Sequence, residues 1–157
     1  MNRLVGNIWD APPGTAICIP TNVGWKRDGS NVMGRGVALQ ASRRYPTLAA
    51  EYGHWCMFHG AELFIVPSLS YGDNRRLVCF PVKPPATNPA LSWRQPADLG
   101  LINHSTIALS ERFRHTQVWL PLVGCGNGGL APADVLPILD RYLDDRFTLV
   151  TMGTLPL

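Results

Sequence analysis

Two glycine-rich stretches contain residue types suited to binding a phosphate group. Residues 33–37 read M-G-R-G-V, and residues 124–130 read G-C-G-N-G-G-L. Because glycine has no side chain, it lets a ligand approach the main chain closely. Each stretch is predicted to open a helix, whose first N–H groups are unpaired and carry the positive end of the helix dipole. Two such loops side by side would form a cleft of backbone donors around a diphosphate.

Lys83 is the side chain best placed by the sequence to add chemistry to such a cleft. It follows the β-rich run V-C-F-P-V and precedes Pro84 and Pro85, which restrict the backbone. Near a diphosphate, its simplest role is to pair its charge with phosphate. A lysine whose pKa is lowered by desolvation can also act as a nucleophile or proton carrier. The residues alone favour charge pairing and leave both roles open.

The histidines and cysteines do not form a metal-binding pattern. In H-W-C-M-F-H (54–59), the spacing of His54, Cys56 and His59 does not gather three ligands on one helical face. The chain has no C-x-x-C pair, and three of its four cysteines lie in apolar, strand-like runs. We therefore expect buried free thiols, no metal and no cofactor.

The composition is that of a globular protein. The chain has 157 residues, of which 46% are hydrophobic and 16% charged, so we expect one domain spanning residues 1–157. No window approaches 18 uninterrupted apolar residues, and the N-terminus lacks the apolar run of a signal peptide. We therefore expect a cytoplasmic protein without a membrane span. The net charge of +3 suits an anionic ligand and permits nucleic acid without requiring it.

Hydrophobic periodicity and turn residues predict alternating strands and helices. The predicted strands are 3–8, 15–20, 62–67, 76–82, 117–123 and 147–151. The predicted helices are 33–45, 47–59, 97–114 and 132–144, and the segments 21–32 and 84–96 are predicted loops. The turn-rich S-Y-G-D-N-R (70–75) predicts a hairpin between the third and fourth strands. An α/β layered fold with a mixed sheet follows.

The second glycine stretch also matches the dinucleotide pattern G-x-G-x-x-G, at Gly124, Gly126 and Gly129. A dinucleotide-binding domain of the Rossmann type needs several further strand–helix units after this loop. Here a single helix and a single strand are predicted to follow. The loop therefore lies at the wrong end of the chain for that fold.

Taken together, the motifs resemble those of the macro domain family. The resemblance rests on T-N (21–22), M-G-R-G-V-A-L-Q (33–40) and L-P-L-V-G-C-G-N-G-G-L (120–130), with G-N-I (6–8) ending the first strand. It spans about residues 4–152. The helix start M-G-R-G-V-A-L-Q and F-P-V-K (80–83) resemble the branch that contains DNA ADP-ribosyl glycohydrolase antitoxins and terminal ADP-ribose protein glycohydrolases. This resemblance implies a three-layer α/β/α fold that binds ADP-ribose across its two loops.

The resemblance also implies roles for individual residues. Asn22 matches the asparagine that contacts the distal ribose, Lys83 matches the catalytic lysine of this branch, and Asn7 or Ile8 falls where adenine is bound. The two loops match those that bind the diphosphate and the distal ribose. With Asn22 and Lys83 as the catalytic candidates, the candidate binding residues are Asn7, Ile8, Thr21, Asn31, Met33, Gly34, Arg35, Gly36, Val37, Gly124, Cys125, Gly126, Asn127, Gly128, Gly129 and Leu130.

The chain differs from the family pattern in three places. The segment between Asn22 and Met33, which contains W-K-R-D-G-S, is longer by several residues. Gly128 occupies the place where protein-directed glycohydrolases have an aspartate. The sequence ends after the macro domain, so the second domain of the antitoxins is not expected.

The resulting hypothesis is an ADP-ribosyl glycohydrolase that removes ADP-ribose from DNA, with protein as the less favoured acceptor. We expect a monomer whose partner is ADP-ribose or an ADP-ribosylated macromolecule, including single-stranded DNA. Gly128, in place of an acid, favours the alternative of a reader that binds ADP-ribose without hydrolysis. A third alternative is an ADP-ribose 1''-phosphate phosphatase. It needs a group that activates water, and no motif places one of the four histidines at the loops.

Overall fold

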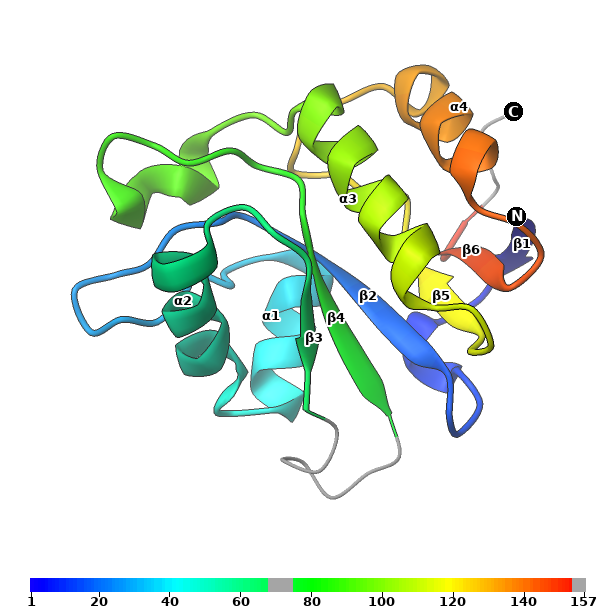
Figure 1. The fold of residues 1–157 in the computed structure, drawn as a ribbon, viewed down its shortest axis with the longest axis horizontal. Helices are drawn as coiled ribbons and strands as arrows, with labels where there is room; N and C mark the ends of the chain where they lie inside the picture. Colours follow the sequence, from blue (N-terminus) through cyan, green and yellow to red (C-terminus); the bar gives the residue numbers. More distant parts are fainter. Residues whose placement is uncertain (68–74, 154–157) are drawn as a thin grey trace.

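The protein is built on a six-stranded mixed sheet with the strand order β1-β6-β5-β2-β4-β3 (Figure 1). The computed structural model describes residues 1–67 and 75–153. Neighbouring strands are parallel except β3 and β4, which pair antiparallel. The strands are β1 (Asn2–Val5), β2 (Ala16–Thr21), β3 (Phe64–Val66), β4 (Arg76–Pro81), β5 (Val118–Leu120) and β6 (Phe147–Thr151). The structure thus confirms the predicted mixed sheet.

Helices cover both faces of the sheet and complete a three-layer α/β/α fold. The α-helices are α1 (Gly36–Arg44), α2 (Leu48–His59), α3 (Leu99–Arg112) and α4 (Pro132–Tyr142). Two short 3-10 helices, η1 (Ile8–Asp10) and η3 (Pro89–Arg94), lie in the connections. Figure 1 shows α1 and α2 on one side of the sheet and α3 and α4 on the other.

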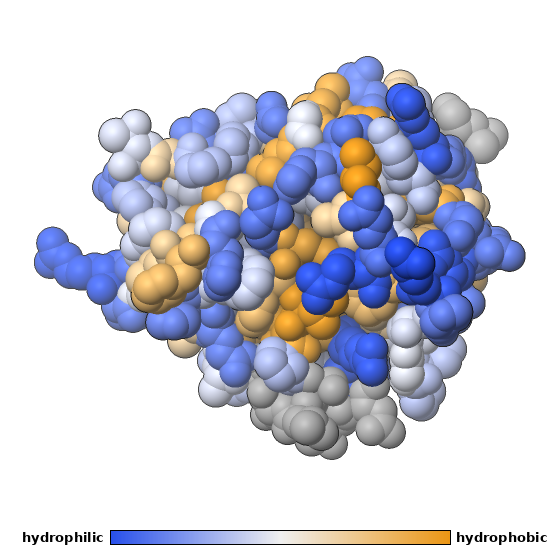
Figure 2. All heavy atoms as spheres, in the orientation of Figure 1, coloured by the Kyte–Doolittle hydropathy of each residue, from blue (hydrophilic) through white to orange (hydrophobic). Residues whose placement is uncertain are grey.

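The alternation of side chains along β2 divides the core into two layers. Ala16 and Cys18 pack into the cluster that includes residues of α3 and α4. Ile17 and Ile19 pack into the cluster that includes residues of α1 and α2. All four are fully buried, as expected for a central strand with both faces covered. Figure 2 shows hydrophilic side chains over most of one outer face, with apolar surface visible near its middle.

Several predicted boundaries were wrong, and asparagine caps account for two of the differences. The strand predicted at 117–123, for example, is only Val118–Leu120. The first strand ends at Val5, because Asn7 accepts a hydrogen bond from the N–H of Trp9 and starts η1. Residues 33–35 are not helical, and α1 begins only at Gly36. The segment 84–96 was predicted to be a loop, yet it contains η3. Most of the predicted hairpin turn at 70–75 lies outside the described residues.

The described cysteines are free, and Cys18, Cys56 and Cys79 are buried, as predicted. Burial raises the pKa of the Cys56 thiol to about 11, so this thiol stays protonated at neutral pH. Cys125 is half-buried. Among the described residues, no helix is both long and apolar enough to cross a membrane.

Candidate functional site

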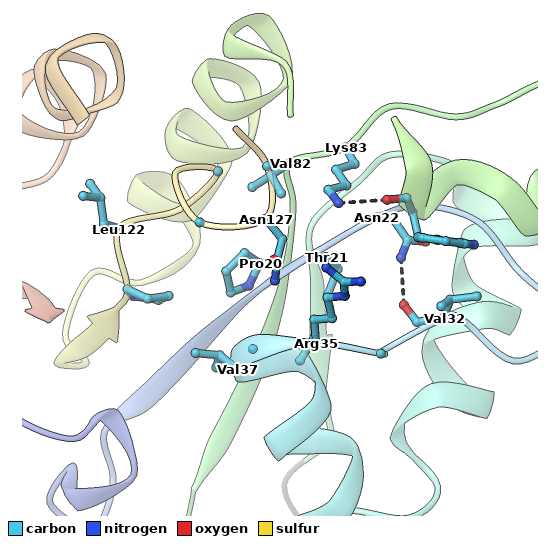
Figure 3. Close-up of a pocket in the computed structure, with 18 residues that line it drawn as sticks. Pro20, Thr21, Asn22, Val32, Arg35, Val37, Val82, Lys83, Leu122 and Asn127 are labelled. Atoms are coloured by element: carbon cyan, nitrogen blue, oxygen red, sulfur yellow. Dashed lines mark hydrogen bonds between the residues drawn. The ribbon is translucent and has the colours of Figure 1, made fainter. Parts of the chain in front are cut away.

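A cleft of about 460 Å³ opens where β2, β4 and β5 end (Figure 3). The carboxyl ends of parallel strands share one edge of the sheet, and ligands of α/β proteins bind there. The volume lies within the range of roughly 300–1,000 Å³ typical of ligand pockets. The residues that line the cleft are Pro20, Thr21, Asn22, Val32, Gly34, Arg35, Gly36, Val37, Ala38, Val82, Lys83, Trp93, Pro121, Leu122, Gly124, Gly126, Asn127 and Gly128.

The start of α1 forms one wall of the cleft. Arg35 is the N-cap residue in an extended conformation, and its side chain makes no capping hydrogen bond. Gly36 follows with a φ of +60°, a conformation that favours glycine. The first N–H groups of α1 therefore have no side-chain cap and can bind an anionic group in the cleft.

The second glycine loop forms the opposite wall and is closed on itself by backbone hydrogen bonds. The N–H of Leu130 donates to the carbonyl of Gly124 at 3.0 Å, and Gly129 donates to Gly126 at 3.2 Å. A Cβ atom at Gly126 would meet nothing within 4 Å, so this position is open to a ligand. Helix α4 begins only at Pro132 and does not line the cleft, so among the described residues of the lining the helix N-terminus comes from α1 and not from α4.

The two loops lie next to each other across the cleft. A Cβ atom at Gly36 would lie 3.9 Å from Nδ2 of Asn127. Gly128 is closely packed, because a Cβ atom there would lie 2.4 Å from the carbonyl oxygen of Gly124. The loop in this conformation therefore has no room for a side chain at position 128.

Asn22 is held in one orientation at the end of β2 and is only 7% exposed. Its Oδ1 accepts hydrogen bonds from the N–H of Gly24 at 3.0 Å and from Nδ2 of Asn31 at 2.8 Å. Its Nδ2 donates to the carbonyl of Val32 at 2.8 Å (Figure 3). An amide nitrogen has two hydrogens, so Nδ2 keeps one for a ligand in the cleft.

A buried polar network fixes the loop that holds Asn22. Asn31 is 2% exposed, and its Nδ2 also donates to the carbonyl of Gly24 at 2.7 Å. The hydroxyl of Tyr52 in α2 donates to the carbonyl of Asn22 at 3.0 Å and accepts from Oγ1 of Thr21 at 2.8 Å. These bonds tie β2 and the following loop to α2, so the position of Asn22 is set before any ligand binds.

Lys83 lies at the end of β4 on the same cleft. Its Nζ donates a hydrogen bond to the carbonyl of Trp93 at 2.8 Å, drawn as a dashed line in Figure 3. Partial desolvation, and then the positive charge of Arg35, lower the pKa of Lys83 below its ordinary value. The cleft lining, as far as the structure describes it, contains no aspartate, glutamate or histidine. Lys83 is therefore the cleft side chain suited to act as nucleophile or proton carrier.

The structure brings most of the candidate residues to the cleft, but not all of them. Those that line it are Thr21, Asn22, Gly34, Arg35, Gly36, Val37, Lys83, Gly124, Gly126, Asn127 and Gly128. Those outside its lining are Asn7, Ile8, Asn31, Met33, Cys125, Gly129 and Leu130. Asn7 caps η1, and Ile8 is 6% exposed in the core, so adenine binding by these two remains a prediction. Asn31 acts on Asn22 instead of reaching the cleft.

Seven residues of the lining were not predicted from the sequence: Pro20, Val32, Ala38, Val82, Trp93, Pro121 and Leu122. Trp93 is the most consequential, because it belongs to the segment that was predicted to be a loop. A signal for η3 is present in Asn88-Pro89, since asparagine is a favoured N-cap and proline is favoured at the first helical position. No local pattern indicates that this helix faces Lys83.

The comparisons with known proteins find relatives and solved structures that are named for ADP-ribose chemistry. No family model matches the chain. A DNA ADP-ribosyl glycohydrolase of Mycobacterium tuberculosis is 33% identical over 110 residues, and the match covers 66% of this chain and 29% of that protein. This chain therefore matches less than a third of its relative's length.

Two solved structures share the fold over nearly the whole chain. The macrodomain of Mycobacterium tuberculosis DarG is 27% identical, with a TM-score of 0.71 over 95% of this chain and 97% of that one. Thermosipho africanus DarTG, solved in complex with ADP-ribose, is 18% identical, with a TM-score of 0.74 over 96% of this chain and 42% of that one. At its lower identity, the second likeness shows the fold alone.

Proposed function

Because the chain is a macro domain that resembles the macrodomain of DarG, we propose that it binds ADP-ribose in the cleft and hydrolyses the bond between ADP-ribose and DNA. The name of the mycobacterial relative, a DNA ADP-ribosyl glycohydrolase, supports this reaction. The same name supports ADP-ribose as the ligand. The cleft then has to bind a diphosphate, orient a ribose and act at its anomeric carbon.

The glycine loops bind the diphosphate in this proposal. The uncapped start of α1 and the open position at Gly126 offer main-chain N–H groups, which suit phosphate oxygens. Arg35 and Lys83 are the charged residues of the described lining, and both are positive. A cleft with this charge favours an anionic ligand. The remaining N–H of Asn22 donates to a hydroxyl of the distal ribose.

The catalytic part of the proposal rests on the environment of Lys83. Its amine lies on the same cleft as Asn22, it is held by the carbonyl of Trp93, and its pKa is lowered by desolvation and by Arg35. A lowered pKa increases the fraction of neutral amine, which is the nucleophilic form. Lys83 acts at the anomeric carbon in one of two ways. The neutral amine attacks as the bond to the DNA base breaks, a proton of the amine passes to the base, and water then hydrolyses the bond to lysine and releases ADP-ribose; or the amine stabilises the opened sugar while water adds to it.

A reader that binds ADP-ribose without hydrolysis is the second candidate function. It is favoured by the lack of any carboxylate among the described residues of the lining.

The packing at Gly128 points to DNA in preference to protein, since it leaves no room for the acid of the protein-directed enzymes. A phosphatase has less support, because the described lining offers no histidine or carboxylate to activate water.

The substitution Lys83→Arg separates the enzyme from the reader. Arginine keeps the charge but stays protonated and is a poor nucleophile. We expect release of ADP-ribose from ADP-ribosylated single-stranded DNA to fall by orders of magnitude in single-turnover assays. We expect calorimetry to show free ADP-ribose still binding at roughly micromolar affinity, about −8 kcal/mol. This pattern marks an interaction used in the transition state.

The matched control is Lys26→Arg, since Lys26 is the other lysine of the chain and does not line the cleft, and the exchange keeps its exposed positive charge. Near-normal release by Lys83→Arg would show that Lys83 only pairs charge. Firm binding of ADP-ribose by the unmodified protein, without release from any acceptor, would establish the reader. Faster release from ADP-ribosylated protein than from DNA would overturn the proposed acceptor.

A further inference from the structure

We propose that Trp93 and Arg94 form an acceptor platform, on which a nucleobase of single-stranded DNA stacks beside the point where ADP-ribose is attached. The inference rests on the proposed function and concerns the part of the substrate that the glycine loops do not bind. In this platform the indole of Trp93 supplies the stacking surface. The guanidinium of Arg94 supplies the charge for the DNA backbone.

The position of Trp93 places it at the reacting end of the cleft. Its carbonyl accepts the hydrogen bond from Nζ of Lys83 at 2.8 Å. In the proposed binding mode, the diphosphate lies on the glycine loops and the anomeric carbon lies at Lys83. The leaving group then lies on the side of Trp93. The residue lines the cleft and is nevertheless 38% exposed, so part of its side chain is accessible to a ligand.

The short helix that carries Trp93 is firmly anchored. Ser92 is fully buried, and its hydroxyl donates to the carbonyl of Pro84 at 2.9 Å and accepts from the N–H of Val23 at 3.1 Å. Gly24 packs so tightly that a Cβ atom there would lie 1.9 Å from the carbonyl oxygen of Pro89. An exposed indole on a fixed backbone loses little conformational freedom when a ligand binds, which favours affinity.

The charge around Trp93 suits a nucleic acid. The guanidinium carbon of Arg94 lies 5.1 Å from the centroid of the Trp93 ring, in a cation–π contact. The loop that packs on η3 through Gly24 continues into Lys26 and Arg27, and both are exposed. The acid of that loop, Asp28, accepts hydrogen bonds from Ser30. Proteins bind single strands without sequence preference by combining positive charge with aromatic side chains on which bases stack.

The test measures binding of an ADP-ribosylated, fluorescently labelled single-stranded DNA oligonucleotide by anisotropy. All proteins carry Lys83→Gln, so that the substrate is not consumed. We expect Trp93→Ala to weaken this binding roughly tenfold, the scale of one base–aromatic stack. Trp93→Phe should stay within about threefold, because phenylalanine also stacks. In calorimetry, the affinity for free ADP-ribose should fall much less in Trp93→Ala than the affinity for the oligonucleotide, because free ADP-ribose carries no acceptor base.

Phe58→Ala is the matched control, since Phe58 is 71% exposed on α2 and does not line the cleft. Equal affinity of Trp93→Ala and its parent for the oligonucleotide would overturn the platform. An equal loss on an ADP-ribosylated peptide, or on free ADP-ribose, would also overturn it, because neither ligand carries an acceptor base.

The two proposals fail in different ways. Absence of hydrolysis by the protein with Lys83 intact, together with the Trp93 effect on binding, would overturn the glycohydrolase and support the platform in a reader. Absence of free ADP-ribose binding would overturn the proposed function and this inference together.

Discussion

The amine of Lys83 at the end of β4 donates a hydrogen bond to the main-chain carbonyl of Trp93 in η3, 2.8 Å away. The contact joins the side chain proposed to act at the anomeric carbon to the residue proposed to receive the leaving group. A carbonyl of an anchored helix is a fixed acceptor, so it holds the long lysine side chain in one place. The amine therefore reaches the reacting atom with little loss of side-chain freedom on binding.

The pH dependence of the hydrolysis rate should follow the titration of the Lys83 amine. Its pKa is lowered first by desolvation and then by the positive charge of Arg35. If the neutral amine reacts, the rate rises as pH increases through this lowered pKa. Arg35→Gln removes a like charge, so the pKa of Lys83 should rise and the midpoint of the profile should move to higher pH. Single-turnover rates at saturating substrate over a pH series measure the midpoint.

The matched control for Arg35→Gln is Arg43→Gln, an exposed arginine of the same helix that does not line the cleft. An identical midpoint for Arg35→Gln and the unmodified protein would show that the titrating group is not Lys83 beside Arg35.

Replacing Gly126 with valine should abolish ADP-ribose binding without unfolding the protein. A Cβ atom at this position meets nothing within 4 Å, so the folded chain accepts the side chain. The added methyl groups would occupy the space proposed for the phosphate. Calorimetry with ADP-ribose and thermal unfolding measure the two effects, and Gly153→Val, at another open glycine, is the control. Unchanged affinity would remove the second loop from the binding site.

Replacing Gly128 with aspartate should destabilise the protein and should not create an acid-assisted enzyme. The new Cβ atom would lie 2.4 Å from the carbonyl oxygen of Gly124, so the loop has to move. Overpacking of this kind costs about 1–3 kcal/mol in the free energy of unfolding. Denaturant unfolding measures the cost, and Gly126→Ala in the same loop should show almost none. Equal stability of Gly128→Asp and the unmodified protein would contradict the packing described here.

Tyr52→Phe should loosen the loop that positions Asn22. The change removes the hydroxyl that donates to the carbonyl of Asn22 and accepts from Thr21, which leaves two buried polar groups without this partner. The expected loss in the free energy of unfolding is about 1–3 kcal/mol. Denaturant unfolding, compared with the half-buried control Tyr142→Phe, tests it. If both substitutions lowered the free energy of unfolding by the same small amount, the network would not stabilise the loop.

The sequence by itself determined the layers of this protein and most of its cleft. The alternation along 15–20 and the helical periods that follow indicate a sheet covered on both faces, because side-chain direction repeats every two residues in a strand and every 3.6 in a helix. Gly36, Gly124 and Gly126 indicate close approach of a ligand to the backbone. These features are local, so a short stretch of sequence is enough to reveal them.

The tertiary structure alone decided which side chains meet. β4 and β5 flank β2 in the sheet, which brings Lys83, Asn22 and the second glycine loop to one edge. The N–H of Val23 donates a hydrogen bond to the hydroxyl of Ser92, which is 69 residues away in the sequence. This contact helps to hold the neighbouring Trp93 at the cleft. The side chain of Asn31 donates to Asn22 instead of reaching the cleft, and this too is a result of packing in the folded protein. Contacts between distant segments depend on strand order and on packing that fills space across the whole domain, and no pattern within one segment records them.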